Sequence, residues 1–474
     1  MSFGEIQQQI AASIVQPKFL DQTFNVTDFG GRGDGVTLNT ASFAAAIAAC
    51  AKAGGGRVVI PEGLWLTGPI VFQSNVNLHI EQNALVRFTA DYEAYPLRLV
   101  QLRGVPRVLV TAPLYAENVE NIAITGSGVF DGTGEAWRPI KNWKMTPNQW
   151  RTLLASGGVV ETQKDTQIWW PNEVAMAGEA KYNELIAKGS LDLSEYEAIR
   201  IFMRPRLLHF INCRRVLLDG PTFQNSPFWN VNPLLCEDVT IRNINVRNAW
   251  HSQNGDGLDL ESCQKVLLEH STFDVGDDAI CIKSGINAEG RKIGVPTAQV
   301  VIRDCTVYHG HGGVVIGSEM SGGVNHVYVD RCKFIGTDVG LRFKSTRGRG
   351  GVVEQIQIQN IIMTSIAGDA MTFNLHYEVI APGETVSTQP APAVPVPTEE
   401  TPQFHQIAIK NVTVHGAKQA LYMRGLPESP FADIHFEDIR ISAAAAGLTQ
   451  IDTAAVTFKN VLFTAGDGAI LFKE

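Results

Sequence analysis

The sequence predicts an all-β fold in which short parallel strands stack into a single long β-helix. Two observations support this: a short apolar phrase recurs along the chain, and turns separate the phrases too often to leave room for helical units between them. The composition is that of an ordinary globular protein of 474 residues, 45% hydrophobic and 18% charged, with 44 glycines to supply tight turns.

The recurring phrase begins with a polar residue and continues with alternating aliphatic residues. From Arg215 onward, successive copies lie about 23 to 34 residues apart, with one gap of about 51, in the range of solenoid repeats. A β-propeller is the structural alternative, but its blades repeat at about 40–50 residues. Clear copies begin at Asn75, Asn121, Arg215, Asp238, Lys265, Gln299, His326, Gln355, Gln406 and Asp433.

The N-terminal part differs from the repeats. Residues 1–23 form an arm with some helical pattern, and residues 24–30 run as a strand into a glycine-rich turn. That turn lacks the Gly-Lys-Ser/Thr ending and the spacing of a phosphate-binding loop. Residues 40–53 predict an amphipathic helix with Phe43, Ile47 and Cys50 on one face, which would cap the first coil and cover its core.

Two segments interrupt the β-helix domain, which we expect to span residues 24–474. The first, about 135–206, holds five of the eight tryptophans and has helical patterns over 171–187 and 193–203. This mostly helical insertion either packs against one flank or forms a wall that contacts substrate, because insertions in solenoids gather on the binding face. The second, about 379–403, contains six prolines and predicts an extended surface loop.

The totals narrow the possible partners and the compartment. A net charge of −9 argues against nucleic acid as a partner. The seven cysteines show no pairing pattern and no CxxC motif, so we expect core thiols, without disulfides or a metal site. With no signal-peptide pattern and no membrane segment, we expect a cytoplasmic protein, although a trimmed secreted enzyme would look the same.

Carboxylates gather in two polar islands, Asn254-Gly255-Asp256-Gly257 and Gly276-Asp277-Asp278. Asp277 and Asp278 follow Asp256 by 21 and 22 residues, close to one coil, and neighbouring parallel strands lie about 4.8 Å apart. We therefore expect Asp256 to lie beside the Asp277–Asp278 pair, with Gly276 as a hinge. An isolated Asp-Asp dipeptide is usually a solvated turn, but three clustered carboxylates raise one another's pKa values, as glycoside hydrolysis requires.

Two further islands carry positive charge. His311 is flanked by Gly310 and Gly312, which allow a close approach of the backbone to a ligand, and near carboxylates it would hold an acid's proton by a hydrogen bond. Arg342 and Lys344 are two residues apart on one predicted strand and share a face. Together they form either an exposed basic edge or a site for a sugar carboxylate.

The ordered set Asn-x-Asp, Asp-Asp, Gly-His-Gly and Arg-x-Lys resembles glycoside hydrolase family 28, the polygalacturonases. The resemblance extends from about residue 24 to the C-terminal strands, and includes Gly33-Asp34-Gly35 and Gly317-Ser318-Glu319-Met320. It implies a right-handed, pectin lyase-like parallel β-helix and hydrolysis of α-1,4-galacturonosidic bonds with inversion. One departure is Gly255, where the family usually has threonine.

The resemblance also implies roles for single residues. Asp277 would be the proton donor, Asp256 and Asp278 would hold and activate water, and His311 would support the acid. The substrate would be bound by a further set of residues, Asn254, Arg342, Lys344, Tyr377 and Lys283. No cofactor or metal is implied.

If the insertion and the proline-rich loop close one end of the cleft, the enzyme would act on chain ends of polygalacturonate or oligogalacturonides. A rhamnogalacturonan or xylogalacturonan hydrolase is an alternative within the same chemistry. From other classes, a pectate lyase or a non-catalytic carbohydrate-binding β-helix would share the fold. The three-carboxylate cluster argues against both, because a binding module gains nothing from acids that repel one another.

Overall fold

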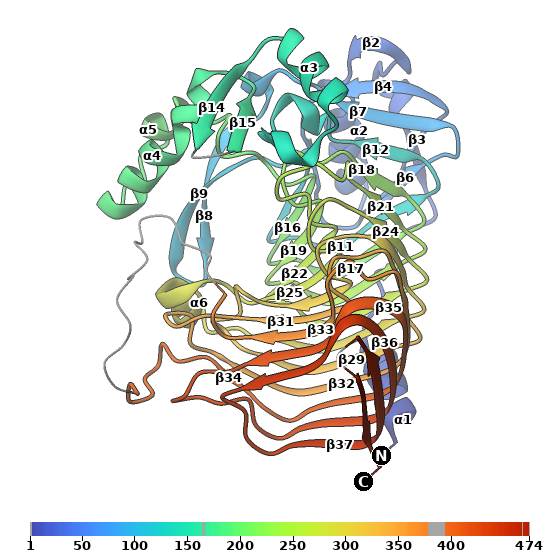
Figure 1. The fold of residues 1–474 in the computed structure, drawn as a ribbon. Coiled ribbons are helices and arrows are strands. Elements are labelled where there is room, and N and C mark those ends of the chain that lie inside the picture. Colours follow the sequence, from blue (N-terminus) through green and yellow to red (C-terminus); the bar gives the residue numbers. More distant parts are fainter. Residues whose placement is uncertain (1, 164–165, 378–393, 467, 474) are drawn as a thin grey trace.

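A computed structural model describes residues 2–163, 166–377, 394–466 and 468–473 of the chain. They form a right-handed parallel β-helix with one strand per coil in each ladder, and the insertion stands beside its N-terminal half (Figure 1). The predicted fold is confirmed. No helix among the described residues is long and apolar enough to cross a bilayer.

Three ladders of parallel strands form the walls of the β-helix. The first, which carries the candidate site, comprises β5 (Ile70–Val71), β10 (Leu114–Glu117), β16 (Leu208–Ile211), β19 (Val231–Leu234), β22 (Leu258–Glu261), β25 (Ile280–Lys283), β28 (Val314–Ile316), β31 (Leu341–Lys344) and β33 (Asp369–Asn374).

The second ladder is the long one and contains the recurring phrase. It comprises β1 (Thr23–Asn25), β3 (Gly56–Ile60), β6 (Val76–Ile80), β11 (Glu120–Gly126), β17 (Arg214–Asp219), β20 (Glu237–Arg242), β23 (Gln264–Glu269), β26 (Thr297–Arg303), β29 (Val324–Asp330), β32 (Val352–Thr364), β35 (Ile407–Arg424), β36 (Ile434–Ile451) and β37 (Val456–Ala465).

The third ladder closes each coil. It comprises β2 (Asp34–Leu38), β4 (Gly63–Thr67), β7 (Ala84–Phe88), β12 (Val129–Asp131), β18 (Thr222–Gln224), β21 (Asn245–Arg247), β24 (Thr272–Asp274), β27 (Thr306–His309) and β30 (Lys333–Ile335). In the later coils β32, β35 and β36 run through the corners. The short β34 (Gln403–Phe404) pairs with β32, and β38 (Gly468–Phe472) pairs antiparallel with β37.

Alternation along each strand divides the inside of the coil from the outside. Side chains of like kind stack from coil to coil in the interior, for example Val216, Val239, Val266, Val300 and Val327 of the second ladder, all almost fully buried. Phe343 and Phe373 stack 4.3 Å apart between ring centroids. Burial of these continuous stacks is the main favourable contribution to the stability of the β-helix.

Both predicted N-terminal features are present. Helix α2 (Thr40–Lys52) turns Phe43, Ile47 and Cys50 onto the first coil, as expected of a cap. Helix α1 (Phe3–Ser13), in the arm, folds back along the outside of the second ladder, where Ile10 and Ile14 pack with Leu267, Val301 and Tyr328. A 3₁₀ turn, η1 (Val26–Phe29), links the first strand to the glycine-rich turn.

The insertion has its own small core. Helices α3 (Pro147–Ala155), α4 (Glu173–Lys188) and α5 (Leu193–Glu197) surround a three-stranded antiparallel sheet of β13 (Ile140–Lys141), β15 (Thr166–Trp170) and β14 (Val159–Gln163). The predicted helix over 193–203 stops at Glu197, because Ile199 and Ile201 turn into that core. Short 3₁₀ turns lie at η3 (Gly134–Ala136) and η4 (Asn142–Lys144).

A hairpin ahead of the insertion was not predicted. Strands β8 (Leu97–Leu102) and β9 (Val105–Val110) pair antiparallel beside the insertion, preceded by η2 (Tyr92–Ala94), and helix α6 (Asn287–Ile293) contacts β9 from a later coil (Figure 1). Of the predicted proline-rich loop, residues 379–393 lie outside the described residues, and 394–402 form neither helix nor strand.

All seven cysteines are buried and free, as predicted. Burial raises the pKa of the Cys50 thiol to about 11, and it also raises the pKa of Cys236 and Cys281. The reactive form of cysteine is the thiolate. These thiols are both out of reach of a reagent and held in the uncharged form, so we expect them to be unreactive.

We therefore expect none of the seven thiols to react with a disulfide reagent such as DTNB in the native protein, and all seven to react after unfolding in guanidinium chloride. The count of released thionitrobenzoate before and after denaturation tests this. Rapid reaction of one or more thiols under native conditions would contradict the packing described above.

Candidate active site

The predicted acidic residues lie at the start of consecutive strands in the first ladder. Asp256 precedes β22, the Asp277–Asp278 pair precedes β25, and Gly312 precedes β28. Two backbone hydrogen bonds of 2.9 Å continue the ladder beyond the strand ends: Gly257 N donates to Asp278 O, and Ala279 N donates to Gly312 O. Asp256 thus lies one coil from Asp278, as the spacing predicted.

Glycines permit the close packing of these loops. A Cβ atom at Gly276 would lie 2.5 Å from both the Ala249 carbonyl oxygen and Ser252 Oγ, so no side chain fits there. A Cβ at Gly255 would overlap Ser252 Oγ. Ser252 therefore explains why this chain has glycine where the resemblance leads one to expect threonine.

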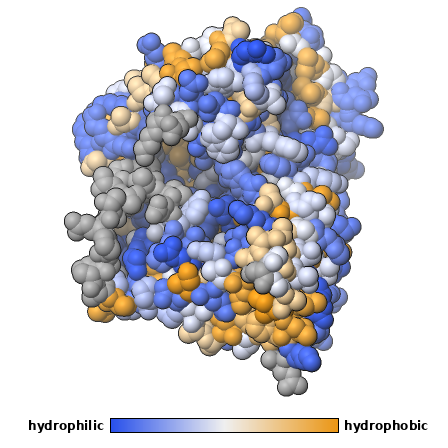
Figure 2. All heavy atoms as spheres, viewed as in Figure 1, coloured by the Kyte–Doolittle hydropathy of each residue, from blue (hydrophilic) through white to orange (hydrophobic). Residues whose placement is uncertain are grey.

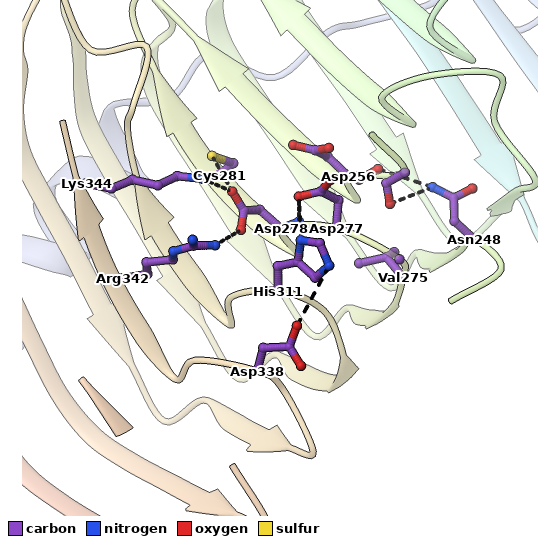
Figure 3. Close-up of polar contacts among 12 residues, drawn as sticks. Asn248, Asp256, Val275, Asp277, Asp278, Cys281, His311, Asp338, Arg342 and Lys344 are labelled. Carbon is purple, nitrogen blue, oxygen red and sulfur yellow. Dashed lines mark hydrogen bonds and ion pairs between the residues drawn. The ribbon is translucent and has the colours of Figure 1, made fainter. Parts of the chain in front are cut away.

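Asp278 is the carboxylate most strongly paired with cations. Its Oδ2 lies 2.6 Å from Lys344 Nζ and its Oδ1 lies 3.2 Å from Arg342 Nη1 (Figure 3). Burial opposes ionisation of Asp278, but the charges of Lys344 and Arg342 outweigh it and lower its pKa. Asp278 is therefore an anion held behind two cations that come from a strand two coils further on.

Asp277 is paired with the predicted histidine. His311 Nδ1 lies 3.1 Å from Asp277 Oδ1, and the backbone N of His311 donates to Asp277 O. Burial raises the pKa of Asp277, but the hydrogen bond and charge of His311 and the charges of Lys344 and Lys144 outweigh it and lower the pKa. The other nitrogen of His311, Nε2, faces Asp338 Oδ2 at 3.7 Å and Lys144 Nζ at 3.4 Å.

Asp256 has the opposite electrostatic environment. It is 3% exposed, and its nearest cation is Lys283, with Nζ 3.4 Å from Oδ2. Burial and the charge of Asp259 raise its pKa well above the ordinary value. A proton in the free protein is therefore held more tightly by Asp256 than by Asp277, although the resemblance assigns the acid role to Asp277.

The three carboxylates form one cluster. Asp256, Asp277 and Asp278 each place an oxygen within 4.8 Å of the others. Three oxygens this close could also surround a cation, but Lys344, Arg342 and Lys283 already supply positive charge at hydrogen-bond or ion-pair distance. The arrangement suits proton transfer among acids of unequal pKa.

The predicted substrate-binding residues lie in different surroundings. Tyr377 covers the cationic pair, with Lys344 Nζ 4.7 Å and Arg342 Cζ 5.3 Å from its ring centroid. The side-chain oxygen of Asn254 accepts a 3.0 Å hydrogen bond from Arg204 Nη2. Lys283 is 3% exposed and faces carboxylates rather than open space.

Several residues at the site were not singled out from the sequence. The insertion brings Lys144 to His311, and Arg204 lies at the C-terminal end of the same insertion; neither belongs to a repeat, so no spacing marked them. Asp259 lies three residues after Asp256 and had a signal, a further carboxylate on a strand otherwise of Leu and Glu. Trp229 lies one coil before Asp259, and the centroid of its ring is 3.5 Å from Lys283 Nζ.

The surface around the site is polar. In the view of Figure 2, hydrophilic side chains occupy much of the middle of the face between the insertion and the later coils, whereas hydrophobic side chains gather over the C-terminal coils. A polar, charged surface above a row of carboxylates favours a sugar ligand over an apolar one.

Comparison with known proteins agrees with this chemistry. Residues 199–461 match the model of glycosyl hydrolases family 28. The chain is 32% identical to a hyperthermoactive exopolygalacturonase from Thermotoga maritima, covering 99% of each chain with a TM-score of 0.81. It is 27% identical over 455 residues to an exo-poly-alpha-D-galacturonosidase of Dickeya chrysanthemi, covering 94% of this chain and 71% of that one.

A family 28 exopolygalacturonase of Yersinia enterocolitica shares the fold at 22% identity and a TM-score of 0.72, covering 94% of this chain and 76% of that one. The family model matches more than half of the chain, and it includes the three aspartates, His311, Arg342 and Lys344. The chain therefore belongs to glycoside hydrolase family 28 and is a glycosidase.

Proposed function

We propose that this enzyme hydrolyses α-1,4-galacturonosidic bonds of polygalacturonate and oligogalacturonides from the chain end. The observation that carries the proposal is a cluster of three carboxylates that lies beside the Arg342–Lys344 pair, both members of which contact Asp278. A galacturonate unit brings a carboxylate of its own, and an arginine fork beside a lysine suits such a group. The similar Thermotoga and Dickeya proteins, an exopolygalacturonase and an exo-poly-alpha-D-galacturonosidase, support the same substrate class.

Exposure supports Asp277 as the proton donor. Its side chain is 19% exposed, against 5% for Asp256 and 3% for Asp278, so of the three it is the one a glycosidic oxygen can reach. The low pKa of Asp277 belongs to the free protein. A substrate carboxylate near Arg342 and Lys344 offsets their charge and expels water, and both effects raise the pKa of Asp277.

The buried pair then acts on water. Asp278 is ionised and fixed by Lys344 and Arg342, and Asp256 lies one coil away, so a water between them would be oriented for attack as a proton moves to one carboxylate. Inverting enzymes with two carboxylates usually separate them by about 6.5–9.5 Å. The closer cluster here means that inversion is proposed from the family resemblance rather than from this distance.

The insertion supports action at chain ends. Lys144, on η4, lies 3.4 Å from His311 Nε2 and 3.3 Å from the Gly276 carbonyl oxygen, so the insertion reaches the catalytic histidine itself. This favours the wall over the simple flank packing that the sequence also allowed. A wall this close leaves little room for a polymer to extend past the reacting sugar on that side.

Product analysis on polygalacturonate and trigalacturonate tests the activity, the acid and the mode of attack together. We expect monogalacturonate as the single early product. We expect Asp277→Asn to reduce kcat by about 10²–10⁴-fold, the usual contribution of a positioned acid. An Asp219→Asn variant is the matched control, because Asp219 pairs with Arg242 on the outer surface, 2.9 Å away.

Each other outcome corrects a different part. A ladder of intermediate oligomers would contradict the proposed wall, and full activity of Asp277→Asn would exclude it as the acid. Cleavage of rhamnogalacturonan or xylogalacturonan, but not of polygalacturonate, would change the assigned substrate and leave the hydrolytic mechanism unchanged. Binding without release of reducing sugar would indicate a carbohydrate-binding β-helix.

Stereochemistry is tested separately by proton NMR during early turnover. Inversion predicts that the new reducing end from an α-linked substrate appears first as the β-anomer and then mutarotates. The α-anomer appearing first would require a covalent intermediate on one of the three aspartates and would contradict the roles proposed here.

Chelation distinguishes hydrolysis from elimination. We expect EDTA to leave the rate unchanged, because side chains of the protein already contact Asp277 and Asp278 at hydrogen-bond or ion-pair distance. A pectate lyase would require calcium and would release an unsaturated product that absorbs ultraviolet light. Loss of activity on chelation with recovery on added calcium would contradict the proposal.

The cytoplasmic location stays a prediction, to be tested by fractionation of the cells that produce the protein.

A further inference from the structure

A fourth carboxylate, that of Asp259, lies fully buried behind the cluster of three. Asp259, on β22, has no exposed surface, and its Oδ1 lies 2.8 Å from Lys283 Nζ. Lys283 sits on the neighbouring strand β25, where Asp259 pairs with Cys281 and Glu261 with Lys283 in the register. Neither residue opens to a substrate, so their role lies in what they do to the carboxylates in front of them.

The ammonium group of Lys283 contacts three carboxylates. Its Nζ lies 2.8 Å from Asp259, 3.4 Å from Asp256 and 3.8 Å from Glu319. The ring of Trp229 lies 3.5 Å away and fixes the ammonium by a cation–π contact. The ammonium therefore lies closer to Asp259 than to Asp256, although it is within hydrogen-bond distance of both.

One buried ammonium cannot fully balance these three carboxylates, of which Asp256 and Asp259 are buried and Glu319 is partly exposed. Burial of an unpaired carboxylate is costly, and such a group takes up a proton instead. Arg342, Lys344 and His311 do not relieve the deficit, since they pair with Asp278 and Asp277. The surplus negative charge is therefore left with Asp256 and Asp259.

We propose that Asp259 and Lys283 are positioning residues that set the protonation state of Asp256 by dividing one ammonium between two buried carboxylates. This inference goes beyond the proposed function. Only the kinetic test of the inference depends on the proposed function being right. It also revises the role of Lys283, which the sequence placed in substrate binding. The pKa of Asp259, raised to about 7 by burial against the charge of Lys283, accords with a shared proton.

Other charged groups around Asp256 stay in place in the variants below. Asp277 and Asp278 raise the pKa of Asp256 by repulsion. Lys144 and Arg204, both from the insertion, also interact with Asp256 by charge. Glu319 and Asp278 also act on Asp259, and Cys281 and Glu319 act on Lys283.

Two nearly isosteric variants should shift the pH dependence of kcat/KM in opposite directions. In Asp259→Asn the ammonium pairs fully with Asp256, so Asp256 ionises at lower pH and the acidic limb moves down by about 1 unit, the low end of the effect of a close opposite charge. In Lys283→Met the ammonium is lost and the acidic limb moves up by a similar amount. Lys283→Arg should restore most of the wild-type profile.

Matched controls carry the same chemical changes far from the site. Asp219→Asn removes a surface carboxylate paired with Arg242, and Lys265→Met removes a surface ammonium 2.8 Å from Glu237. Neither should move the limb. The proposal would be overturned if the acidic limb moved in the same direction in Asp259→Asn and Lys283→Met, or did not move in either. Loss of activity in both variants would not rescue it, because a pair with only a structural role would lower kcat without shifting the limb in opposite directions.

A substrate-free measurement separates this inference from the proposed function. The folded-state pKa of Asp259 is raised from 3.8 to about 7, so its contribution to stability is complete below about pH 4 and is lost as pH rises through about 7. Wild-type Tm should therefore fall more steeply between pH 5 and 8 than the Tm of Asp259→Asn. Parallel Tm curves would overturn the inference, whereas failure to cleave galacturonan would overturn only the proposed function.

Discussion

The in-register stacking of parallel coils is the constraint on which the site depends. Neighbouring strands lie about 4.8 Å apart, so residues one coil apart in the sequence are neighbours in space. This brings the Asp256 loop against the Asp277–Asp278 loop and places Arg342 and Lys344 on a later strand of the same ladder. No long loop is needed to assemble the cluster, and the stacked apolar interior holds it rigid.

That closeness creates an electrostatic problem which the same ladder solves. Carboxylates with oxygens within 4.8 Å of one another cannot all ionise in a buried place without compensation. Each therefore has its own partner: Lys344 and Arg342 for Asp278, a hydrogen bond with His311 for Asp277, and part of Lys283 for Asp256. The unequal shares make the three acids chemically different although they are of one residue type.

The repeat spacing carried most of this information in the sequence. It predicted the β-helix, the buried thiols and the contact of Asp256 with the aspartate pair, because each follows from which residues share a coil position. The capping helix was predicted instead from the amphipathic pattern of residues 40–53. The repeat spacing could not place Lys144 or Arg204, which lie in an insertion whose packing is set by its own tryptophan-rich core. It also could not tell that Lys283 faces inward carboxylates, since that depends on Asp259 in the adjoining coil.

Protonation in this site is a property of the group rather than of one residue. The free protein holds its proton most tightly near Asp256 and Asp259, whereas the exposed carboxylate that can reach a glycosidic oxygen is Asp277. A substrate that brings its own carboxylate to Arg342 and Lys344 weakens the cations that keep Asp277 ionised. The acid would thus be created by the binding of an acidic sugar, which links the specificity of the site for galacturonate to the chemistry that it performs.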